Sequence, residues 1–345
     1  MARIANLFKL AARLYSLKHH HSFKLNASCL NYVEINSSVQ LQALQLSQLQ
    51  APIWLLGEGS NCVFVDDFQG TVVRIKTKGI KLTENPDHFL LGVSAGENWH
   101  KFVFWCMQHN IFGFENLALI PGTVGATPIQ NIGAYGVEIE SFIQTVEYLC
   151  LASGETKQLS HAECQFAYRD SIFKNQLNGR VIITKVIFAL PKKWQGVTHY
   201  GELARLSNPE PRDIFKQVVK IRRTKLPDPQ IIGNAGSFFK NPVIDKNIFE
   251  HLQQKWPNIP NYAAGQEKVK IAAAWLIERL GFKGKSIGGI RCHPDQALVL
   301  TNTGEGTGEQ LLELAREIKR EVGAEFGIEL ENEVQLIAAK GLIKL

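Results

Sequence analysis

The chain has 345 residues and a formal net charge of +6 at pH 7. Its 45% hydrophobic and 20% charged residues are typical of a globular protein that is long enough for two or three domains. No apolar run reaches the roughly 20 residues of a membrane-spanning helix. No dense block of Lys and Arg with interleaved aromatic residues indicates nucleic-acid binding. The basic charge would suit an anionic small-molecule substrate without requiring one.

The first 20 residues form a basic segment, since no acidic residue precedes Glu34. Lys9 and Arg13 interrupt its apolar positions, which argues against a signal peptide. We predict a peripheral amphipathic helix here; an alternative is that such a helix lies on a membrane surface. The apolar face of the expected helix consists of Ile4, Leu7, Phe8, Ala11, Leu14 and Tyr15.

Beyond residue 22, the apolar spacing mixes short strands with amphipathic helices. In chain order it predicts a helix over 35–49 capped by Ser37 or Ser38, strands over 51–57, 62–68 and 71–76, a helix over 99–110, strands over 144–152 and 181–190, helices over 268–284 (stopped at Gly281) and 308–327, and a strand over 327–338. There is no internal repeat. The fold class indicated is α+β, with a domain boundary in the Pro-rich stretch 224–230.

The six cysteines are scattered and never form a C-x-x-C pair. Several lie in apolar runs, as buried free thiols do in the reducing cytoplasm. We therefore expect a cytoplasmic protein without a metal site. The cysteines are Cys29, Cys62, Cys106, Cys150, Cys164 and Cys292.

The first glycine-rich motif is LGEGSNCVF, residues 56–64. A dinucleotide-binding fingerprint needs a third glycine and a following helix. Here Cys62 stands at the third position and a strand-like run follows. Residues 57–61, called the glycine loop below, are therefore interpreted as a nest whose backbone N–H groups face one anion. The alternative is a β-turn that uses Gly and Asn for positive φ.

The second motif, IPGTVGATPIQNIGAYG at residues 120–136, holds four glycines and two prolines without one charged residue. Loops of this length usually have a function, and small residues let the backbone approach a large flat ligand. Gln130 and Asn131 offer amide groups for ring edges. The alternative for this uncharged loop is a buried crossing between sheets.

Three further motifs follow the two loops in the chain: YRDSIFK (168–174), GNAGSFFKNP (233–242) and LENEV (330–334). In this order, LGEGSN, the uncharged loop (120–136) and these three motifs resemble the UDP-N-acetylenolpyruvoylglucosamine reductases, the flavoenzymes of the second committed step of peptidoglycan precursor synthesis. The resemblance extends from about residue 22 to about residue 337. One departure is HSFKLNA, where Phe23 is retained but Lys24 replaces a glycine of the family.

The resemblance implies an α+β fold with a two-subdomain FAD-binding region of the vanillyl-alcohol-oxidase type and an α+β substrate-binding domain. The implied division is an extension over 1–20, an FAD-binding region over 21–223 with a split near 75–85, and a C-terminal domain over 224–345, whose last strand could pack back on the first subdomain. A monomer is our default expectation.

The resemblance also implies FAD on both loops. We expect it to be non-covalent, because neither loop supplies a histidine and Cys62 merely follows the glycine loop. The implied FAD-binding residues are Gly57, Gly59, Ser60, Asn61, Pro121, Gly122, Gly125, Ala126, Gln130, Asn131, Gly133 and Ala134.

The family reaction is ping-pong: NADPH reduces FAD and leaves, and the enolpyruvyl ether of UDP-N-acetylglucosamine then accepts the hydride to give UDP-N-acetylmuramate. Charge develops at the carboxylate end, so the site needs cationic or hydrogen-bonding groups and an acid. The resemblance implies that Arg169 holds the carboxylate, Glu333 stabilises the enol with it, and Ser237 donates the proton. The alternatives are a surface ion pair of Arg169 with Asp170 and an outward Glu333.

Further positions match the pocket for the UDP-substrate or NADPH. The tyrosine belongs to a substrate-covering loop found in one subtype of the family, and the lysines are equally typical of a solvated surface. The residues are Tyr200, Lys225, Asn241, Lys283 and Gln296. Two competing functions stay open: a related flavin oxidase for a sugar or alcohol, and a non-catalytic binder of UDP-sugars.

Overall fold

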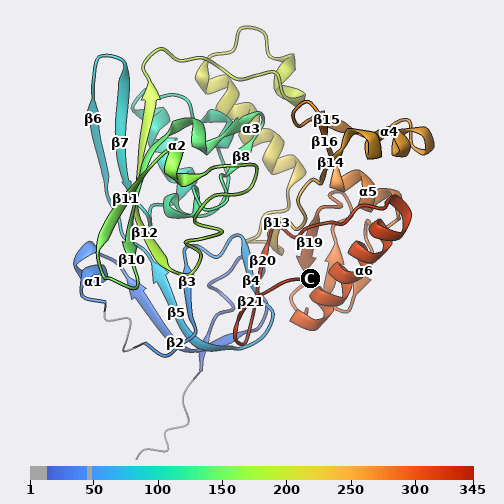
Figure 1. Cartoon of the computed structure of the whole chain (residues 1–345), viewed down its shortest axis with the longest axis horizontal. Helices are drawn as coiled ribbons and strands as arrows, with labels where there is room; N and C mark the ends of the chain where they lie inside the picture. Colours follow the sequence, from blue (N-terminus) through green and yellow to red (C-terminus); the bar gives the residue numbers. More distant parts are fainter. Residues whose placement is uncertain (1–13, 45–48) are drawn as a thin grey trace, which may run out of the picture.

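The computed structural model describes residues 14–44 and 49–345, and its α+β fold confirms the predicted class (Figure 1). Helices and strands alternate irregularly, and each sheet contains antiparallel pairs. The helices are α1 Ser38–Gln42, α2 Trp99–Gln108, α3 Pro211–Lys225, α4 Lys246–Lys255, α5 Ala273–Arg279 and α6 Gly308–Phe326. Of the helices in these described ranges, none is long and apolar enough to cross a membrane.

The first sheet contains four strands in the order β1-β2-β5-β3. Its strand β5 pairs in parallel with both neighbours and is buried along most of its length, which explains its run of apolar residues. The strands are β1 Tyr15–Ser16, β2 Ser28–Ile35, β3 Ile53–Leu56 and β5 Phe68–Ile75. The glycine loop follows β3 directly and leads into another strand rather than into a helix, as predicted.

The C-terminal end of the chain returns to this first subdomain. Strand β20 (Gln335–Ala338) pairs in parallel with β4 (Cys62–Phe64), and β21 (Gly341–Ile343) continues this small sheet. Figure 1 shows the red C-terminal strands beside the blue strand β4. The segment before β20, which carries Glu333, therefore lies next to the glycine loop.

The second sheet is antiparallel, with the strand order β11-β10-β12-β7-β6. Helix α2 packs Trp99 and Phe102 against Phe114 and Phe188 in its core. The strands are β6 Ile80–Glu84, β7 His88–Ser94, β10 Ile143–Cys150, β11 Thr156–Ser160 and β12 Val181–Pro191, and the uncharged loop contains the short pair β8 Gly133–Ala134 and β9 Val137–Glu138.

The C-terminal part has its own core, in which the rings of Phe238 and Phe239 meet edge to face at 5.0 Å. Helices α5 and α6 cover its four-stranded sheet, with the order β13-β19-β18-β17. The strands of this part are β13 Gly233–Ser237, β14 Val243–Asp245, β15 Asn261–Ala263, β16 Lys268–Ile271, β17 Ser286–Ile287, β18 Ile290–Cys292 and β19 Val299–Asn302.

Three predicted elements need correction. The helix expected over 268–284 begins only at α5, because residues 268–271 form the central strand between β14 and β15. The strand expected over 327–338 is restricted to β20. The helix expected over 35–49 is α1 alone, capped by Ser37 as predicted, and residues 45–48 lie outside the described part.

The predicted N-terminal helix also needs correction at its end. Residues 1–13 lie outside the described part of the chain, but Tyr15 belongs to a strand that pairs with β2. Its ring stacks on Tyr32 at 4.1 Å, and Leu17 is fully buried. Pairing with a neighbouring strand therefore outweighs the helical periodicity at Leu14 and Tyr15.

All six cysteines are free thiols, and five of them are buried while Cys150 is half-buried. Within residues 14–44 and 49–345, no group of three His, Cys, Asp or Glu side chains has an arrangement that could hold a metal ion.

Helix α6 begins with a reciprocal cap that yields a stability test. The Thr307 hydroxyl accepts a hydrogen bond from the Gln310 backbone N–H, and the Gln310 side chain accepts one from the Thr307 N–H. We expect Thr307→Ala to lower the free energy of unfolding by about 1 kcal/mol. Thr307→Ser keeps the hydroxyl and is the control in chemical denaturation; equal losses in both variants would contradict the capping role.

Candidate active site

The glycine loop has the features of a candidate anion-binding turn. Gly59 has a φ of 67°, which glycine adopts without strain. The N–H groups of residues 58–61 donate no hydrogen bond to any other described residue. Since buried or half-buried N–H groups normally have a partner, this loop has the donor arrangement of an anion-binding nest.

The uncharged loop lies directly against the glycine loop. A Cβ atom added at Gly57 would stand 2.7 Å from the Thr123 Oγ1, and one at Gly122 would stand 2.9 Å from the Ser60 Oγ. The Asn61 Nδ2 donates to the Gln130 Oε1 at 2.7 Å. The two loops therefore form one continuous surface, and the close approach explains why glycine is needed at both positions.

Two cavities extend along this surface. The larger, of about 340 Å³, lies between strands β3 and β12 and is mainly apolar. The smaller, of about 80 Å³, is lined by both loops; among its lining residues are Ser60, Asn61, Pro121, Ala126, Gln130 and Lys174. An elongated apolar cavity that ends at an anion-binding loop fits a long ligand with a flat apolar part and a phosphate group.

Arg169 and Glu333 form an ion pair, with 3.1 Å between Nε and Oε1. The Arg169 Nη2 also donates to the Gly133 carbonyl at 2.8 Å, and Nη1 lies 3.4 Å from the Asn131 carbonyl. Arg169 has a φ of 54°, a left-handed conformation that is uncommon for a residue with a side chain. The alternative ion pair with Asp170 is wrong, because that carboxylate accepts from Asn175 and Ser171 instead.

Glu333 points inward, unlike its neighbours. Its side chain is 16% exposed, against 87% for Glu329 and 72% for Glu331. Burial raises the pKa of the Glu333 carboxyl, and the nearby Arg169 and Lys174 partly oppose this shift. The carboxyl can therefore carry a proton closer to neutral pH than an exposed glutamate does.

Ser237 is brought next to Glu333 through the backbone. It ends strand β13, and the carbonyl of the next residue, Phe238, accepts a hydrogen bond from the Glu333 N–H at 2.8 Å. The preceding Gly236 has a φ of 75° and no atom within 4 Å of the position of a Cβ. The structure thus brings the three predicted catalytic residues together. Arg169 and Glu333 are in direct contact, and Ser237 precedes the residue whose carbonyl accepts from the Glu333 N–H.

Three charged groups at this site were not predicted. Lys174 donates to the Arg169 carbonyl at 3.1 Å and lines the smaller cavity, and burial lowers its pKa. The Lys270 Nζ lies 4.5 Å from the Tyr168 ring centre, and burial lowers its pKa too. Burial raises the pKa of Glu138. Lys174 sits within the YRDSIFK motif, a signal that could have identified it, whereas Lys270 falls in the strand mistaken for a helix.

The remaining predicted residues are less closely joined. Tyr200 stacks on Tyr262 at 6.0 Å, and the Asn241 Oδ1 accepts from the Ala273 N–H at the start of α5. Lys225 and Lys283 form ion pairs with Glu202 and Glu278, and the Gln296 carbonyl accepts from Val299. Within the described residues, Lys225, Lys283 and Gln296 make no hydrogen bond or ion pair with the catalytic three.

Family models match two separate parts of the chain. Residues 228–337 match the C-terminal domain of UDP-N-acetylenolpyruvoylglucosamine reductase, and residues 32–160 match an FAD binding domain. A UDP-N-acetylenolpyruvoylglucosamine reductase of Pseudoalteromonas atlantica is 52% identical over 345 residues, which is 100% of both chains. The chain belongs to this reductase family. It is accordingly a flavin oxidoreductase with FAD as its cofactor.

Other members of the UDP-N-acetylenolpyruvoylglucosamine reductase family agree. A reductase of Shewanella oneidensis is 49% identical, covering 95% of this chain and 97% of the relative. The crystal structure of UDP-N-acetylenolpyruvylglucosamine reductase from Thermus caldophilus has a TM-score of 0.63 at 20% identity and covers 94% of this chain and 97% of that one. At this identity the structural likeness supports the fold alone.

The inward position of Glu333 predicts an unusual pH dependence of stability. Because its pKa is raised in the folded chain, the stability from its proton is complete below the ordinary value of 4.5 and is lost as the pH rises through the folded pKa. Glu333→Gln cannot ionise, so we expect it to match the wild type below pH 4.5 and to become the more stable chain toward neutral pH. Chemical denaturation across this pH range measures the difference.

Glu331→Gln is the control, with the opposite sign. The hydrogen bond from Lys240 lowers the pKa of Glu331, so its stability contribution is present above 4.5 and is lost as the pH falls. That variant should therefore be the less stable chain at neutral pH. The same direction for both substitutions would contradict the role of burial at Glu333.

Proposed function

We propose that this chain reduces the enolpyruvyl ether of UDP-N-acetylglucosamine to UDP-N-acetylmuramate, with NADPH as the hydride donor and FAD as the carrier in a ping-pong sequence. When bound, FAD would pass a hydride from NADPH to the substrate. The observation that carries this proposal is the Arg169–Glu333 ion pair. Arg169 also donates to the Gly133 carbonyl in the uncharged loop, and the Glu333 N–H donates to the carbonyl of Phe238, the residue after Ser237. The membership of the reductase family supports it.

FAD would be held without a covalent bond. Cys62 is buried, and burial raises the pKa of its thiol to about 12, so it is a poor nucleophile beside the glycine loop. The diphosphate would accept hydrogen bonds from the glycine loop and the ring system would lie along the uncharged loop. The residues proposed to hold FAD are Gly57, Gly59, Ser60, Asn61, Pro121, Gly122, Gly125, Ala126, Gln130, Asn131, Gly133 and Ala134.

Arg169 retains donors for the substrate carboxylate. A guanidinium has five N–H groups, and Glu333, Gly133 and Asn131 accept at most three of them. The remaining N–H groups can bind the carboxylate where negative charge develops after hydride addition. Lys174 lines the smaller cavity and donates to the Arg169 carbonyl, so its ammonium group would add positive charge near this carboxylate.

Glu333 and Ser237 would supply the acidic groups that the reaction needs. A protonated Glu333 can donate a hydrogen bond to the enol, which its raised pKa favours. Ser237 would donate its hydroxyl proton to the neighbouring carbon. The open space beside Gly236 leaves room for a substrate to approach this hydroxyl.

The UDP-substrate or NADPH would contact a wider set of side chains from the C-terminal part. Tyr200, stacked on Tyr262, offers a half-exposed aromatic surface. The Lys225 side chain is 52% exposed, so its exposed pair with Glu202 can exchange for a diphosphate oxygen. The proposed residues are Tyr200, Lys225, Asn241, Lys283 and Gln296.

We further propose the division into an extension over 1–20, an FAD-binding region over 21–223 and a C-terminal domain over 224–345. The gap between the end of β5 and the start of β6 at residues 76–79 supports a split between the two subdomains there. We also propose a cytoplasmic location, which the free thiols of all six cysteines support, and a monomer as the default state.

The proton-donor role predicts that Ser237→Ala will separate the two half-reactions. Under anaerobic conditions NADPH should still reduce the flavin at a near-normal rate. Reoxidation by the enolpyruvyl substrate should slow by several orders of magnitude, because the acid that completes the reaction is missing. Stopped-flow absorbance of the flavin measures both steps.

Ser286→Ala, on the opposite edge strand of the same sheet, is the control and should leave both half-reactions unchanged. Equal losses in both half-reactions of Ser237→Ala would mean that the serine only shapes its turn. Oxygen consumption with a sugar or alcohol and without NADPH would favour a flavin oxidase instead. A chain that binds no flavin even after refolding with FAD would favour a non-catalytic binder.

A further inference from the structure

The carbonyl groups of the glycine loop are held by hydrogen bonds from residues outside the uncharged loop. Residues 15–25, called the N-terminal strap here, supply part of this hold. The Ser22 N–H donates to the Gly59 carbonyl at 2.9 Å, and the Ser22 Oγ donates to the Ser60 carbonyl at 3.4 Å. A Cβ at Gly59 would collide with the carbonyl of His20, so the strap lies in tight contact with the loop.

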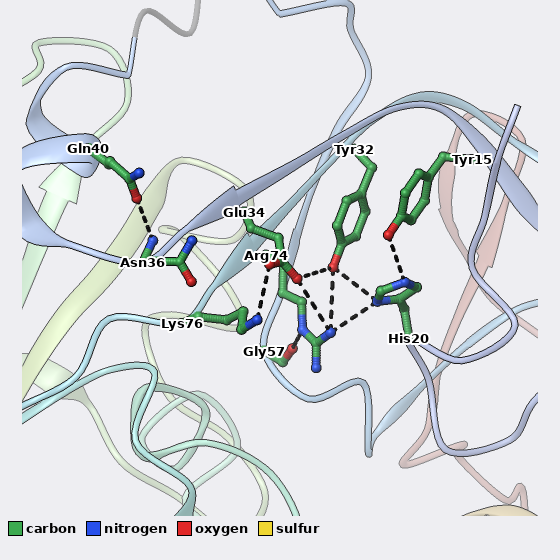
Figure 2. A network of polar contacts seen from close by, with 9 residues as sticks. All are labelled: Tyr15, His20, Tyr32, Glu34, Asn36, Gln40, Gly57, Arg74 and Lys76. Atoms are coloured by element: carbon green, nitrogen blue, oxygen red, sulfur yellow. Dashed lines mark hydrogen bonds and ion pairs between the residues drawn. The ribbon is translucent and has the colours of Figure 1, made fainter. Parts of the chain in front are cut away.

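Arg74, on strand β5, holds the remaining end of the loop. Its Nε donates to the Gly57 carbonyl at 3.2 Å (Figure 2). Its Nη1 donates to the His20 Nδ1 at 3.0 Å and approaches the Tyr32 hydroxyl at 3.5 Å. The guanidinium therefore joins the glycine loop, the strap and the first sheet in one network.

The bonding around His20 is consistent only with a neutral ring that accepts at Nδ1. The Arg74 guanidinium can only donate, so the ring proton lies on Nε2, which faces the Tyr15 hydroxyl at 3.1 Å. Burial and the adjacent Arg74 lower the pKa of His20, in agreement with this tautomer. The Tyr32 hydroxyl also donates to Glu34, which lies 3.8 Å from the Arg74 Nη1.

Because a trans peptide unit is planar, fixing the carbonyl of one residue also fixes the direction of the next residue's N–H. Arg74 and Ser22 fix the carbonyls of residues 57, 59 and 60, and the Gln335 N–H donates to the Asn61 carbonyl. Binding to a preformed donor array avoids the entropy cost of ordering the loop.

We propose that Arg74 is a positioning residue for the flavin: it holds the glycine loop in its anion-binding conformation through the Gly57 carbonyl, and the strap residue His20 and Tyr32 hold Arg74 in place. This inference rests on the proposed placement of the FAD diphosphate on the glycine loop. It goes beyond that placement because it assigns cofactor affinity to residues that line neither of the cavities described above.

The test compares the FAD dissociation constants of full-length variants. Each apoprotein is titrated with FAD, and the flavin fluorescence is followed. Arg74→Gln should raise the dissociation constant about tenfold, since a charge-assisted hydrogen bond to the loop is lost. At saturating FAD the defect should largely disappear from kcat, because the described contacts of the Arg74 side chain include none with Arg169, Ser237 or Glu333. Arg74→Lys should recover little affinity, since one ammonium cannot occupy both bonding positions.

Lys76→Gln is the matched control. Lys76 directly follows strand β5 and pairs with the same Glu34 carboxylate at 3.0 Å, but makes no hydrogen bond to the glycine loop. Its loss removes an equal charge, so FAD affinity should stay within about twofold of the wild type. Tyr32→Phe keeps the aromatic ring and removes one hydroxyl, and should weaken FAD binding about threefold.

Equal FAD affinity of Arg74→Gln and Lys76→Gln would overturn the inference. So would a lowered thermal midpoint of the Arg74→Gln apoprotein without a change in FAD affinity, because Arg74 would then support the fold alone. A wild-type chain that binds no FAD would overturn the proposed function as well, whereas tight wild-type binding that Arg74→Gln retains would overturn this inference only.

Discussion

The hydrogen bonds of Asn61 connect the separate parts of the site, and the rest of the arrangement depends on them. Its side-chain amide donates to the Gln130 side chain at 2.7 Å and to the Glu333 carbonyl at 3.3 Å, while its own carbonyl accepts from the Gln335 N–H at 3.0 Å. One residue thus connects the glycine loop, the uncharged loop and the C-terminal segment. Any change in the angle of the glycine loop would be transmitted to the carboxyl group that contacts Arg169.

The side chains proposed for catalysis are placed at some cost to stability. Glu333 is buried beside a guanidinium that also satisfies two backbone carbonyls, and desolvation outweighs the attraction strongly enough to raise its pKa. A buried ion pair is often no more stabilising than apolar residues of the same size. Arg169 adds a left-handed backbone conformation. Strain and buried charge at one position are expected where chemistry, rather than folding, has selected the residues.

The sequence predicted what depends on local patterns and missed what depends on distant partners. Glycines marked both loops, and the absence of charge marked the longer one. The cap at Ser37 and the apolar face of α2 follow from short-range spacing. The segment KVKI lies beside a helical run, but β14 and β15 on either side make it a strand. Arg74 was not predicted, because its hydrogen bonds to Gly57 and His20 connect positions that are distant in sequence and share no motif.

The large sequence separations between contacting residues also bear on the order in which parts of the site form during folding. The hydrogen bond from Asn61 to Glu333 spans 272 positions, and the parallel pair β4–β20 closes the same loop. Closing a loop of this length costs more conformational entropy than forming a local contact. We therefore expect both contacts to form after the local sheets and helices. We expect the strap and β5 to shape the glycine loop early, and the Glu333 carboxyl to reach Arg169 only when β20 pairs with β4. The proposed catalytic carboxyl group is therefore in place only when the whole fold is complete.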